Sequence, residues 1–250
     1  MTSQPLFSLV GKNALITGGG SGIGKAIAHA LSNVGARISL VGRRQALLTD
    51  ALEGRDGIGI ATDLLAEDAP QVIHAACAEA DIIPDIIVSA AGLNPRKHAD
   101  DVTPEIWQRT MHLNLAVPFF VAQAFVPHMK QNNWGRIINI ASLQSTRAFT
   151  NGIAYGASKG GVSQLTRAMA EAWSKDGINA NAIAPGFFPT ELTAAVFGDD
   201  EVAGHHASMT CIGRNGELDD LVGPAVFLAS DASVYITGQV INVDGGYTAK

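Results

Sequence analysis

The sequence predicts an α/β fold of one domain, in which a doubly wound, seven-stranded parallel sheet carries helices on both faces. The chain has 250 residues, of which 47% are hydrophobic, enough for one well-filled core. Seven short aliphatic runs alternate with longer helix-like stretches. The runs do not alternate polar and apolar residues, which is typical of strands covered on both faces. This alternation favours a parallel sheet with right-handed crossovers.

The predicted strands follow one another at fairly regular intervals. They are NALIT (13–17), RISLV (37–41), GIGIAT (57–62), DIIVSA (85–90), RIINIAS (136–142), NANAIAP (179–185) and QVINVD (239–244). The stretch KAIAHALSNVG between the first two predicts a helix that ends at Gly35, a suitable C-cap. No linker interrupts the chain, so residues 1–250 are expected to form a single domain. The 187–215 segment is the least regular part and is expected to act as a lid.

Composition excludes several classes of partner. The net charge of −6 argues against a protein that binds nucleic acid. The first residues show no secretory signal and no apolar run reaches membrane-spanning length, so we expect no membrane partner and a cytoplasmic location. The two cysteines, Cys77 and Cys211, lack metal-binding or CxxC spacing and are expected to be reduced thiols. His205 and His206 are adjacent, do not share a helix face and have no accompanying ligand set, so no metal site is expected.

The segment TGGGSGIG (17–24) lies between the first strand and the first helix. Gly18, Gly22 and Gly24 have the spacing G-x-x-x-G-x-G, which lets the backbone turn tightly and approach a pyrophosphate. The helix N-terminus beyond them offers free N–H groups and the positive end of the helix dipole. Glycines alone would also fit a flexible turn, but their place between strand and helix favours nucleotide binding.

The second strand ends in Gly42-Arg43-Arg44, where dinucleotide-binding proteins often have an acidic residue that bonds the ribose 2′-OH. Glycine removes the repulsion that a carboxylate would exert on a 2′-phosphate, and Arg43 can donate to phosphate oxygens in fork geometry. The pair therefore predicts NADP, with Arg43 as primary contact and Arg44 as a weaker one, and with NAD as a second possibility. Two solvated arginines at a strand end are the alternative.

Asp63 closes the third predicted strand. It could accept a hydrogen bond from the adenine amino group, or it could be the N-cap of a helix that starts at Leu64. The sequence leaves both readings open.

The stretch Tyr155-Gly-Ala-Ser-Lys159 places a tyrosine and a lysine on one helix face. A nearby ammonium stabilises the phenolate and lowers its pKa, which suits acid–base work on an alcohol or carbonyl. Ser142, at the end of the fifth strand, could bond the reacting oxygen. Asn114 lies in the apolar helical stretch HLNLAVPFF, where it could bend the helix and hold a water, or be an ordinary satisfied core residue.

Taken together, these motifs resemble the short-chain dehydrogenase/reductase family over essentially the whole chain. The resemblance rests on TGGGSGIG, Asp63, the Ala91-Gly92 pair, Asn114, Ser142, Tyr155, Lys159, and Pro185-Gly186 followed by Thr190. It implies a Rossmann fold and a homotetramer. It also implies that Tyr155 is the acid/base, Lys159 its pKa-lowering partner and ribose ligand, Ser142 the substrate anchor and Asn114 the water-relay residue. The cofactor contacts that it implies are Gly18, Ser21, Gly22, Ile23, Gly24, Arg43, Arg44, Asp63, Leu64, Ala91, Gly92, Tyr155, Lys159, Pro185, Gly186 and Thr190.

The chain departs from the family at Ser89-Ala90-Ala91-Gly92, where Asn-Asn-Ala-Gly is usual. The small Ala91-Gly92 pair still lets the backbone pass close to the cofactor. The lost amides are expected to affect support of the central sheet more than catalysis.

Three stretches resemble gluconate 5-dehydrogenases and related sugar-acid dehydrogenases: INIASLQS (138–145), PTELTAA (189–195) and VDGGYTA (243–249). Arg96 follows the fourth strand, where it could pair with a substrate carboxylate, and Gln144 could bond hydroxyls. The loop around Arg96 could instead be solvated or lie at a subunit contact. The expected reaction is NADP(H)-dependent interconversion of a secondary alcohol and a ketone, with gluconate and 5-keto-gluconate as the leading pair. A 3-oxoacyl-thioester reductase is the alternative, and a non-catalytic NADP sensor or scaffold is a remote one.

Overall fold

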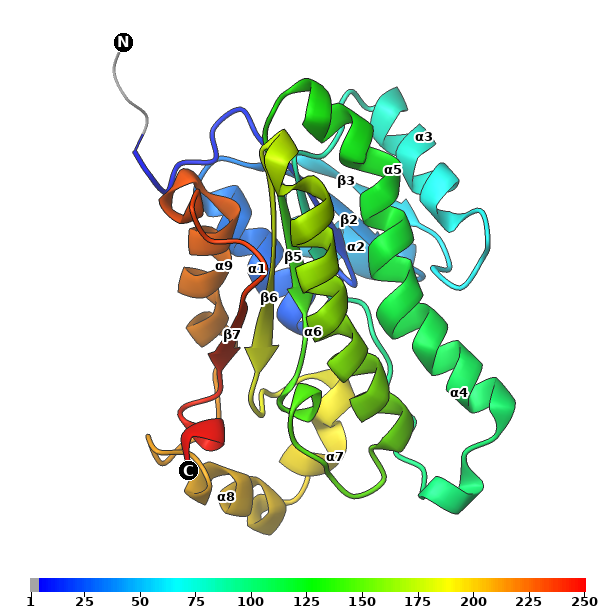
Figure 1. The fold of residues 1–250 in the computed structure, drawn as a ribbon, viewed down its shortest axis with the longest axis vertical. Coiled ribbons are helices and arrows are strands. Elements are labelled where there is room, and N and C mark those ends of the chain that lie inside the picture. Colours follow the sequence, from blue (N-terminus) through cyan, green and yellow to red (C-terminus); the bar gives the residue numbers. More distant parts are fainter. Residues whose placement is uncertain (1–4) are drawn as a thin grey trace.

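The computed structural model describes residues 5–250 and shows a central parallel sheet between two layers of helices (Figure 1). The strand order is β3-β2-β1-β4-β5-β6-β7, and every neighbouring pair is parallel. The strands are β1 (Asn13–Thr17), β2 (Arg37–Gly42), β3 (Gly57–Ala61), β4 (Ile86–Ser89), β5 (Gly135–Ile140), β6 (Ile178–Pro185) and β7 (Val240–Val243). The predicted seven-stranded, doubly wound sheet is confirmed.

Helices cover both faces of this sheet. They are α1 (Gly22–Asn33), α2 (Gln45–Leu52), α3 (Ala69–Glu79), α4 (Pro104–Met111), α5 (Val117–Gln131), α6 (Ile153–Trp173), α7 (Ala194–Phe197), α8 (Asp200–Ser208) and α9 (Val222–Ala229). One core cluster joins the sheet to α1, α2 and α9, and the other joins it to α3, α5 and α6. Along β4, Ile86 and Val88 belong to the first cluster and Ile87 to the second. Each strand is therefore apolar on both sides, which explains its continuous aliphatic run.

The order of the strands reverses beside β1, because β2 lies on one side of it and β4 on the other. The connections from these two strands leave in opposite directions, and the carboxyl ends of the strands border a crevice at that point. The predicted cofactor and catalytic residues follow these carboxyl ends. Topology alone thus brings together groups that are far apart in the sequence.

Two local expectations need correction. Strand β5 ends at Ile140, so Ser142 lies two residues beyond the strand, where its hydroxyl accepts a hydrogen bond from the Gln144 backbone N–H at 3.1 Å. The 187–215 segment is more regular than expected, since it contains a 3-10 turn at Glu191–Thr193 followed by α7 and α8. By contrast, α1 ends as expected: Gly35 follows the C-cap with a φ of +108°, a conformation that favours glycine.

The long helical run Pro104–Gln131 consists of α4, a π-helical turn at His112–Ala116, and α5. Among the described residues, it is the one helix with the length and apolar composition needed to cross a membrane, although the sequence offered no such candidate. Core helices meet the same criteria, and this one packs on α3 and α6 with Phe125 fully buried. Asn114 lies in this π turn, and such turns often occur at functional sites.

Candidate active site

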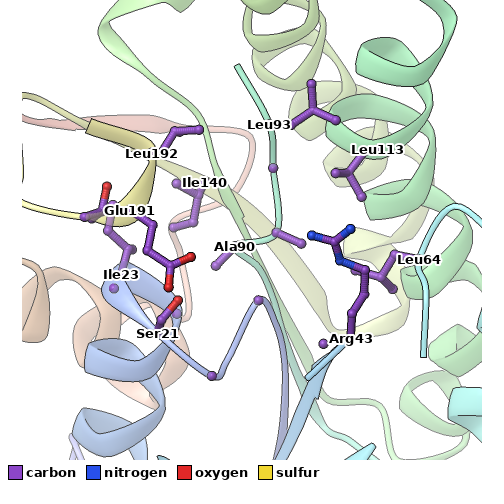
Figure 2. Close-up of a pocket in the computed structure, with 18 of the residues that line it drawn as sticks. Ser21, Ile23, Arg43, Leu64, Ala90, Leu93, Leu113, Ile140, Glu191 and Leu192 are labelled. Carbon is purple, nitrogen blue, oxygen red and sulfur yellow. The ribbon is translucent and has the colours of Figure 1, made fainter. Parts of the chain in front are cut away.

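A cavity of about 470 Å³ opens at the carboxyl edge of the sheet. Figure 2 shows its lining side chains, which come from the ends of several strands and from the 187–215 segment. Most of the predicted site residues line it, namely Gly18, Ser21, Gly22, Ile23, Gly24, Arg43, Arg44, Asp63, Leu64, Ala91, Gly92, Ser142, Tyr155, Lys159, Pro185, Gly186 and Thr190. Asn114, Arg96 and Gln144 lie outside this lining.

The glycine loop forms one wall of the cavity and has no room for side chains. A Cβ at Gly24 would lie 2.2 Å from the carbonyl oxygen of Gly18, and one at Gly18 would lie 2.9 Å from the backbone nitrogen of Ala91. Helix α1 starts directly at Gly22 and has no acidic residue in its first turn. Its free N–H groups therefore face the cavity without a competing carboxylate from their own helix, so this wall fits a pyrophosphate.

Arg43 and Arg44 occupy different positions. Figure 2 shows Arg43 reaching from the end of β2 into the cavity near Leu64 and Ala90, where it can meet the ribose side of a dinucleotide. Arg44 instead donates from Nη2 to both carboxylate oxygens of Glu191, at 3.0 Å each. In this structure Arg44 therefore does not present its charge freely to a phosphate, although it lines the same cavity.

Asp63 uses Oδ1 to accept a hydrogen bond from the backbone N–H of Leu65, at 3.1 Å. Helix α3 starts only at Ala69, so the proposed helix N-cap is wrong and the carboxylate caps a turn instead. Because Asp63 also lines the cavity, the adenine contact remains a prediction.

Tyr155 lies in the first turn of α6 and is 8% exposed, with its side chain at the cavity wall. Burial raises the pKa of its phenol, while a hydrogen bond to Ser142 and the charge of Arg96 lower it. The sequence predicted that Lys159 would lower this pKa. In this structure, however, the Lys159 Nζ lies 5.7 Å from the Tyr155 ring centroid and is not among the groups that shift it. Ser142, not Lys159, is thus the neighbour that favours the charged form of the phenol.

Lys159 is one helical turn beyond Tyr155 and is 5% exposed. Its Nζ donates to the carbonyl oxygen of Ile140, the last residue of β5, at 2.6 Å. Burial lowers the pKa of the Lys159 ammonium to about 8. A shift toward neutral pH is typical of lysines in functional sites.

Asn114 is 1% exposed and lies behind Leu93, a residue of the cavity wall to which it is hydrogen-bonded. Its amide accepts from the backbone N–H of Leu93 and donates to the Leu93 carbonyl, both at 2.9 Å, and also donates to Ser158 Oγ at 3.0 Å. A Cβ at Gly92 would lie 3.3 Å from Asn114 Oδ1 and 3.8 Å from Lys159 Nζ. Asn114 and Lys159 therefore both lie close to Gly92, and the Asn114 amide fixes the loop that follows β4.

Comparison with known proteins decides the family. A family model described as enoyl-(acyl carrier protein) reductase matches residues 18–248. The chain is 38% identical over 256 residues, 100% of both chains, to a gluconate 5-dehydrogenase of Gluconobacter oxydans. It is 40% identical to a 2-dehydro-3-deoxy-D-gluconate 5-dehydrogenase of Escherichia coli, over 98% of both chains.

A solved structure shares the fold closely. It is a gluconate 5-dehydrogenase from Burkholderia cenocepacia in complex with NADP and tartrate, with a TM-score of 0.92, 37% identity and 98% coverage of both chains. The chain belongs to the short-chain dehydrogenase/reductase family. The predicted family, Rossmann topology, cofactor type and oxidoreductase class are confirmed.

Two of the predicted substrate residues of this short-chain dehydrogenase, Arg96 and Gln144, lie outside the cavity lining and have different surroundings. Arg96 has a φ of +48° and donates to the carbonyl of Leu192 at 3.2 Å, so it joins the loop after β4 to the 187–215 segment. Gln144 Oε1 is buried without a hydrogen-bond partner among residues 5–250, and it lies where a Cβ on Gly152 would collide with it. The Gln144 amide therefore packs under the start of α6 instead of lining the cavity.

The short-chain dehydrogenase cavity also contains residues that the sequence did not single out: Leu93, Arg109, Leu113, Ile140, Phe188, Glu191, Leu192 and Thr193. The sequence could not indicate the apolar residues, because a leucine that lines a cavity has the same sequence pattern as a leucine in the core. Glu191 had a weak signal, since it follows Thr190 at the cavity edge. Among residues 5–250, no three His, Cys, Asp or Glu side chains gather as a metal site would require.

Proposed function

We propose that this enzyme interconverts a secondary alcohol and a ketone on a sugar acid, with gluconate and 5-keto-gluconate as the leading pair and NADP(H) as cofactor. Support comes from the site chemistry and from relatives that carry gluconate dehydrogenase names at full-length coverage. The cofactor preference rests on Arg43 at the cavity wall and on the glycine at position 42, where a carboxylate would repel the 2′-phosphate. NAD is the second possible cofactor, and the experiment described below compares it with NADP.

The catalytic roles follow from the positions of the side chains. When bound, the nicotinamide supplies or takes up the hydride. The Ser142 hydroxyl holds the substrate oxygen, and the Tyr155 phenol beside it gives or receives the proton. Lys159, with a pKa of about 8, can pass protons near neutral pH, and from its place in the cavity wall it would hold a ribose hydroxyl of the cofactor. Asn114 positions Leu93 and the turn of chain at Gly92.

One observation carries the choice of an acidic substrate. The Arg96 guanidinium donates to the Leu192 carbonyl, and its charge lowers the pKa of both Tyr155 and His206, so it lies near the reacting tyrosine and the 187–215 segment. Only one of its donors is used in a hydrogen bond across the cleft, to Leu192. A carboxylate a few carbons from the reacting hydroxyl would meet the remaining donors of Arg96. The tartrate in the Burkholderia cenocepacia relative is likewise a carboxylate.

A 3-oxoacyl-thioester reductase is the second candidate, because the matching family model is named for an enoyl-(acyl carrier protein) reductase, an enzyme that also acts on acyl thioesters. Its substrate has an uncharged chain near the carbonyl, so Arg96 would contribute little to it. A sensor or scaffold would not need Ser142, Tyr155 and Lys159 around one cavity, and this third reading therefore has the least support.

We also propose a cytoplasmic homotetramer in which the 187–215 segment closes over the substrate. Helices α4, α5 and α6 expose the large apolar side chains Trp107, Phe120 and Ile153, a surface suited to a subunit interface. Before β7, Val234 and Tyr235 are also exposed and suit a second one. Light scattering of the purified protein tests this assembly.

The deciding experiment is a substrate panel read at 340 nm with NAD and NADP. The panel contains gluconate, other sugar acids, polyols of the same length and an acetoacetyl thioester. We expect turnover of sugar acids with NADP and little of the matching polyols, which lack the carboxylate. Turnover restricted to the acetoacetyl thioester would favour the second candidate and contradict the proposal.

A further inference from the structure

An ion pair crosses the mouth of the cofactor cavity. Arg44 is the N-cap residue of α2, two residues after the end of β2, and Glu191 opens the 3-10 turn of the 187–215 segment. The two residues are 147 positions apart, and the Arg44 Nη2 lies 3.0 Å from each carboxylate oxygen of Glu191. Both side chains line the cavity. The pair therefore lies where a dinucleotide enters.

We propose that Glu191 limits the preference for NADP over NAD by competing with the 2′-phosphate for Arg44. This inference rests on the proposed use of NADP. Arg44 directly follows Arg43, the residue placed at the ribose side of the cavity, so a 2′-phosphate bound by Arg43 would lie within reach of Arg44 as well. The Arg44 Nη2 that donates to both carboxylate oxygens of Glu191 cannot make the same hydrogen bonds to the phosphate, so the two anions compete for this donor. NAD has no phosphate there and leaves the pair undisturbed.

The position of Glu191 adds repulsion to this competition. Figure 2 shows its carboxylate over the glycine loop, in the neighbourhood of Ser21 and Ile23. The contact between loop and segment is close, because a Cβ on Gly22 would lie 3.2 Å from Thr190 Cγ2, the residue before Glu191. A carboxylate at that place acts against every phosphate of the cofactor, but the additional charge of the 2′-phosphate makes its effect on NADP larger.

The phosphate is expected to win this competition. The side chains of Arg44 and Glu191 are 59% and 65% exposed, and an exposed pair of this kind changes an equilibrium constant by up to about five-fold. A phosphate with two negative charges offers the arginine a stronger charge-assisted hydrogen bond than one solvated carboxylate does. Glu191 therefore reduces NADP affinity without preventing binding.

The exchange also changes what holds the 187–215 segment. Two side-chain contacts tie the start of this segment to the opposite side of the cleft: Arg44 to Glu191, and Arg96 to the Leu192 carbonyl. A 2′-phosphate that takes Arg44 removes the first of them and leaves the second. Because coupling is reciprocal, NADPH should loosen the start of the segment relative to NADH.

The test compares dissociation constants of NADPH and NADH for full-length wild type and Glu191→Gln, measured by fluorescence titration at low ionic strength. We expect the variant to bind NADPH about two- to five-fold more tightly and to improve NADH binding by a clearly smaller factor. Glu201→Gln, which removes an exposed carboxylate on α8 of the same segment, is the matched control and should change neither constant. In an Arg44→Ala background, Glu191→Gln should lose most of its effect on NADPH.

Equal changes for both cofactors, or no gain in NADPH affinity, would overturn the competition. If wild type bound NADH but not NADPH, the proposed cofactor and this inference would both fail. If wild type preferred NADPH but Glu191→Gln had no effect, only the inference would fail. Hydrogen exchange at residues 190–193 provides a second readout, expected to be faster with NADPH than with NADH.

Discussion

The Lys159 ammonium donates a hydrogen bond to the carbonyl oxygen of Ile140 at 2.6 Å, and this bond connects the catalytic helix α6 to the end of strand β5. Ile140 lies two residues before Ser142, the residue that lowers the pKa of Tyr155. The lysine, the serine and the tyrosine are therefore positioned by one strand end and one helix. The cost of this arrangement is a buried ammonium whose pKa is lowered to about 8.

Replacement of Lys159 by Met should stabilise the protein at neutral pH while removing most activity. In the unfolded chain this lysine has its ordinary pKa of 10.5, so the folded-state value is depressed and burial of the charge destabilises the native state most below pH 8. The shift corresponds to about 3 kcal/mol, and loss of the bond to Ile140 offsets about 1–2 kcal/mol of it. We expect a gain in unfolding free energy of about 1–2 kcal/mol at pH 7.

The pH dependence distinguishes this cause from better packing. As pH rises from 8 to 10.5, the folded wild type sheds the proton before the unfolded chain does, so wild-type stability rises and the advantage of Lys159→Met should shrink. Denaturant unfolding of both proteins at pH 7, 8.5 and 10 measures the difference. A gain that stayed constant across this range would contradict the assignment.

Replacement of Tyr155 by Phe should lower kcat by about 10²–10⁴-fold, the range for loss of a general acid or base. The hydroxyl contacts Ser142 and is otherwise packed, so the fold should be retained. NADPH affinity, measured by fluorescence titration, should change little. A variant that kept full turnover would remove Tyr155 from the mechanism, and a variant that lost NADPH binding would show a structural role instead.

The sequence predicted the sheet well because the strands are apolar on both faces. Leu15, Ile38 and Ile87 are fully buried, and each lies in an aliphatic run that a helix pattern does not explain. It also singled out most of the residues that the structure brings together around one cavity, because glycines with forced geometry and the Tyr155–Lys159 spacing carry strong local signals. These are features in which a few neighbouring residues specify the structure.

The sequence could not predict contacts between distant segments. The pairing of Arg44 with Glu191 depends on how the 187–215 segment folds back over β2, and nothing near Arg44 encodes it. The placement of Gln144 under α6 depends on the missing side chain at Gly152, which reads as an ordinary loop glycine. Tertiary packing decided these positions.

Replacement of Arg43 by Ala should raise the KM for NADP about 10- to 100-fold and that for NAD much less. A hydrogen bond to a charged group contributes about 1.5–3 kcal/mol, which corresponds to this factor. Steady-state kinetics with both cofactors gives the comparison. Arg37→Ala at the opposite end of the same strand is the control and should alter neither KM. Equal increases in KM for both cofactors would contradict a contact with the 2′-phosphate and would favour the alternative that Arg43 is a solvated surface residue.

Replacement of Arg96 by Ala should raise the KM for gluconate about 10- to 100-fold and leave the dissociation constant of NADPH unchanged. The same variant should also have a higher Tyr155 pKa, because the charge of Arg96 lowers it. The limb of the pH profile for alcohol oxidation should therefore move to higher pH. Lys97→Ala, which removes the neighbouring charge, is the control. Unchanged gluconate kinetics in Arg96→Ala would place the carboxylate elsewhere.

Ser89 occupies the place where the family usually has an asparagine, and its hydroxyl forms no hydrogen bond with the described residues, 5–250. Its side chain is 4% exposed, and Oγ has no hydrogen-bond partner among residues 5–250. Ser89 pairs in register with Asn139 on β5, whose Oδ1 is likewise buried and unpartnered. The sheet thus lacks the hydrogen bond that an amide at position 89 could supply, in line with the expected loss of support.

Replacement of Ser89 by Ala should therefore cost almost no stability, within about 0.5 kcal/mol of wild type or slightly above it, because it removes a hydroxyl that forms no bond. Ser158→Ala is the matched variant on α6. Ser158 is fully buried, donates to the Tyr155 carbonyl at 2.7 Å and accepts from Asn114 Nδ2 at 3.0 Å, so its loss should cost about 1–3 kcal/mol. Denaturant unfolding of both variants gives the comparison. A large loss in Ser89→Ala would mean that Ser89 Oγ and Asn139 Oδ1 share a buried partner, such as a bridging water.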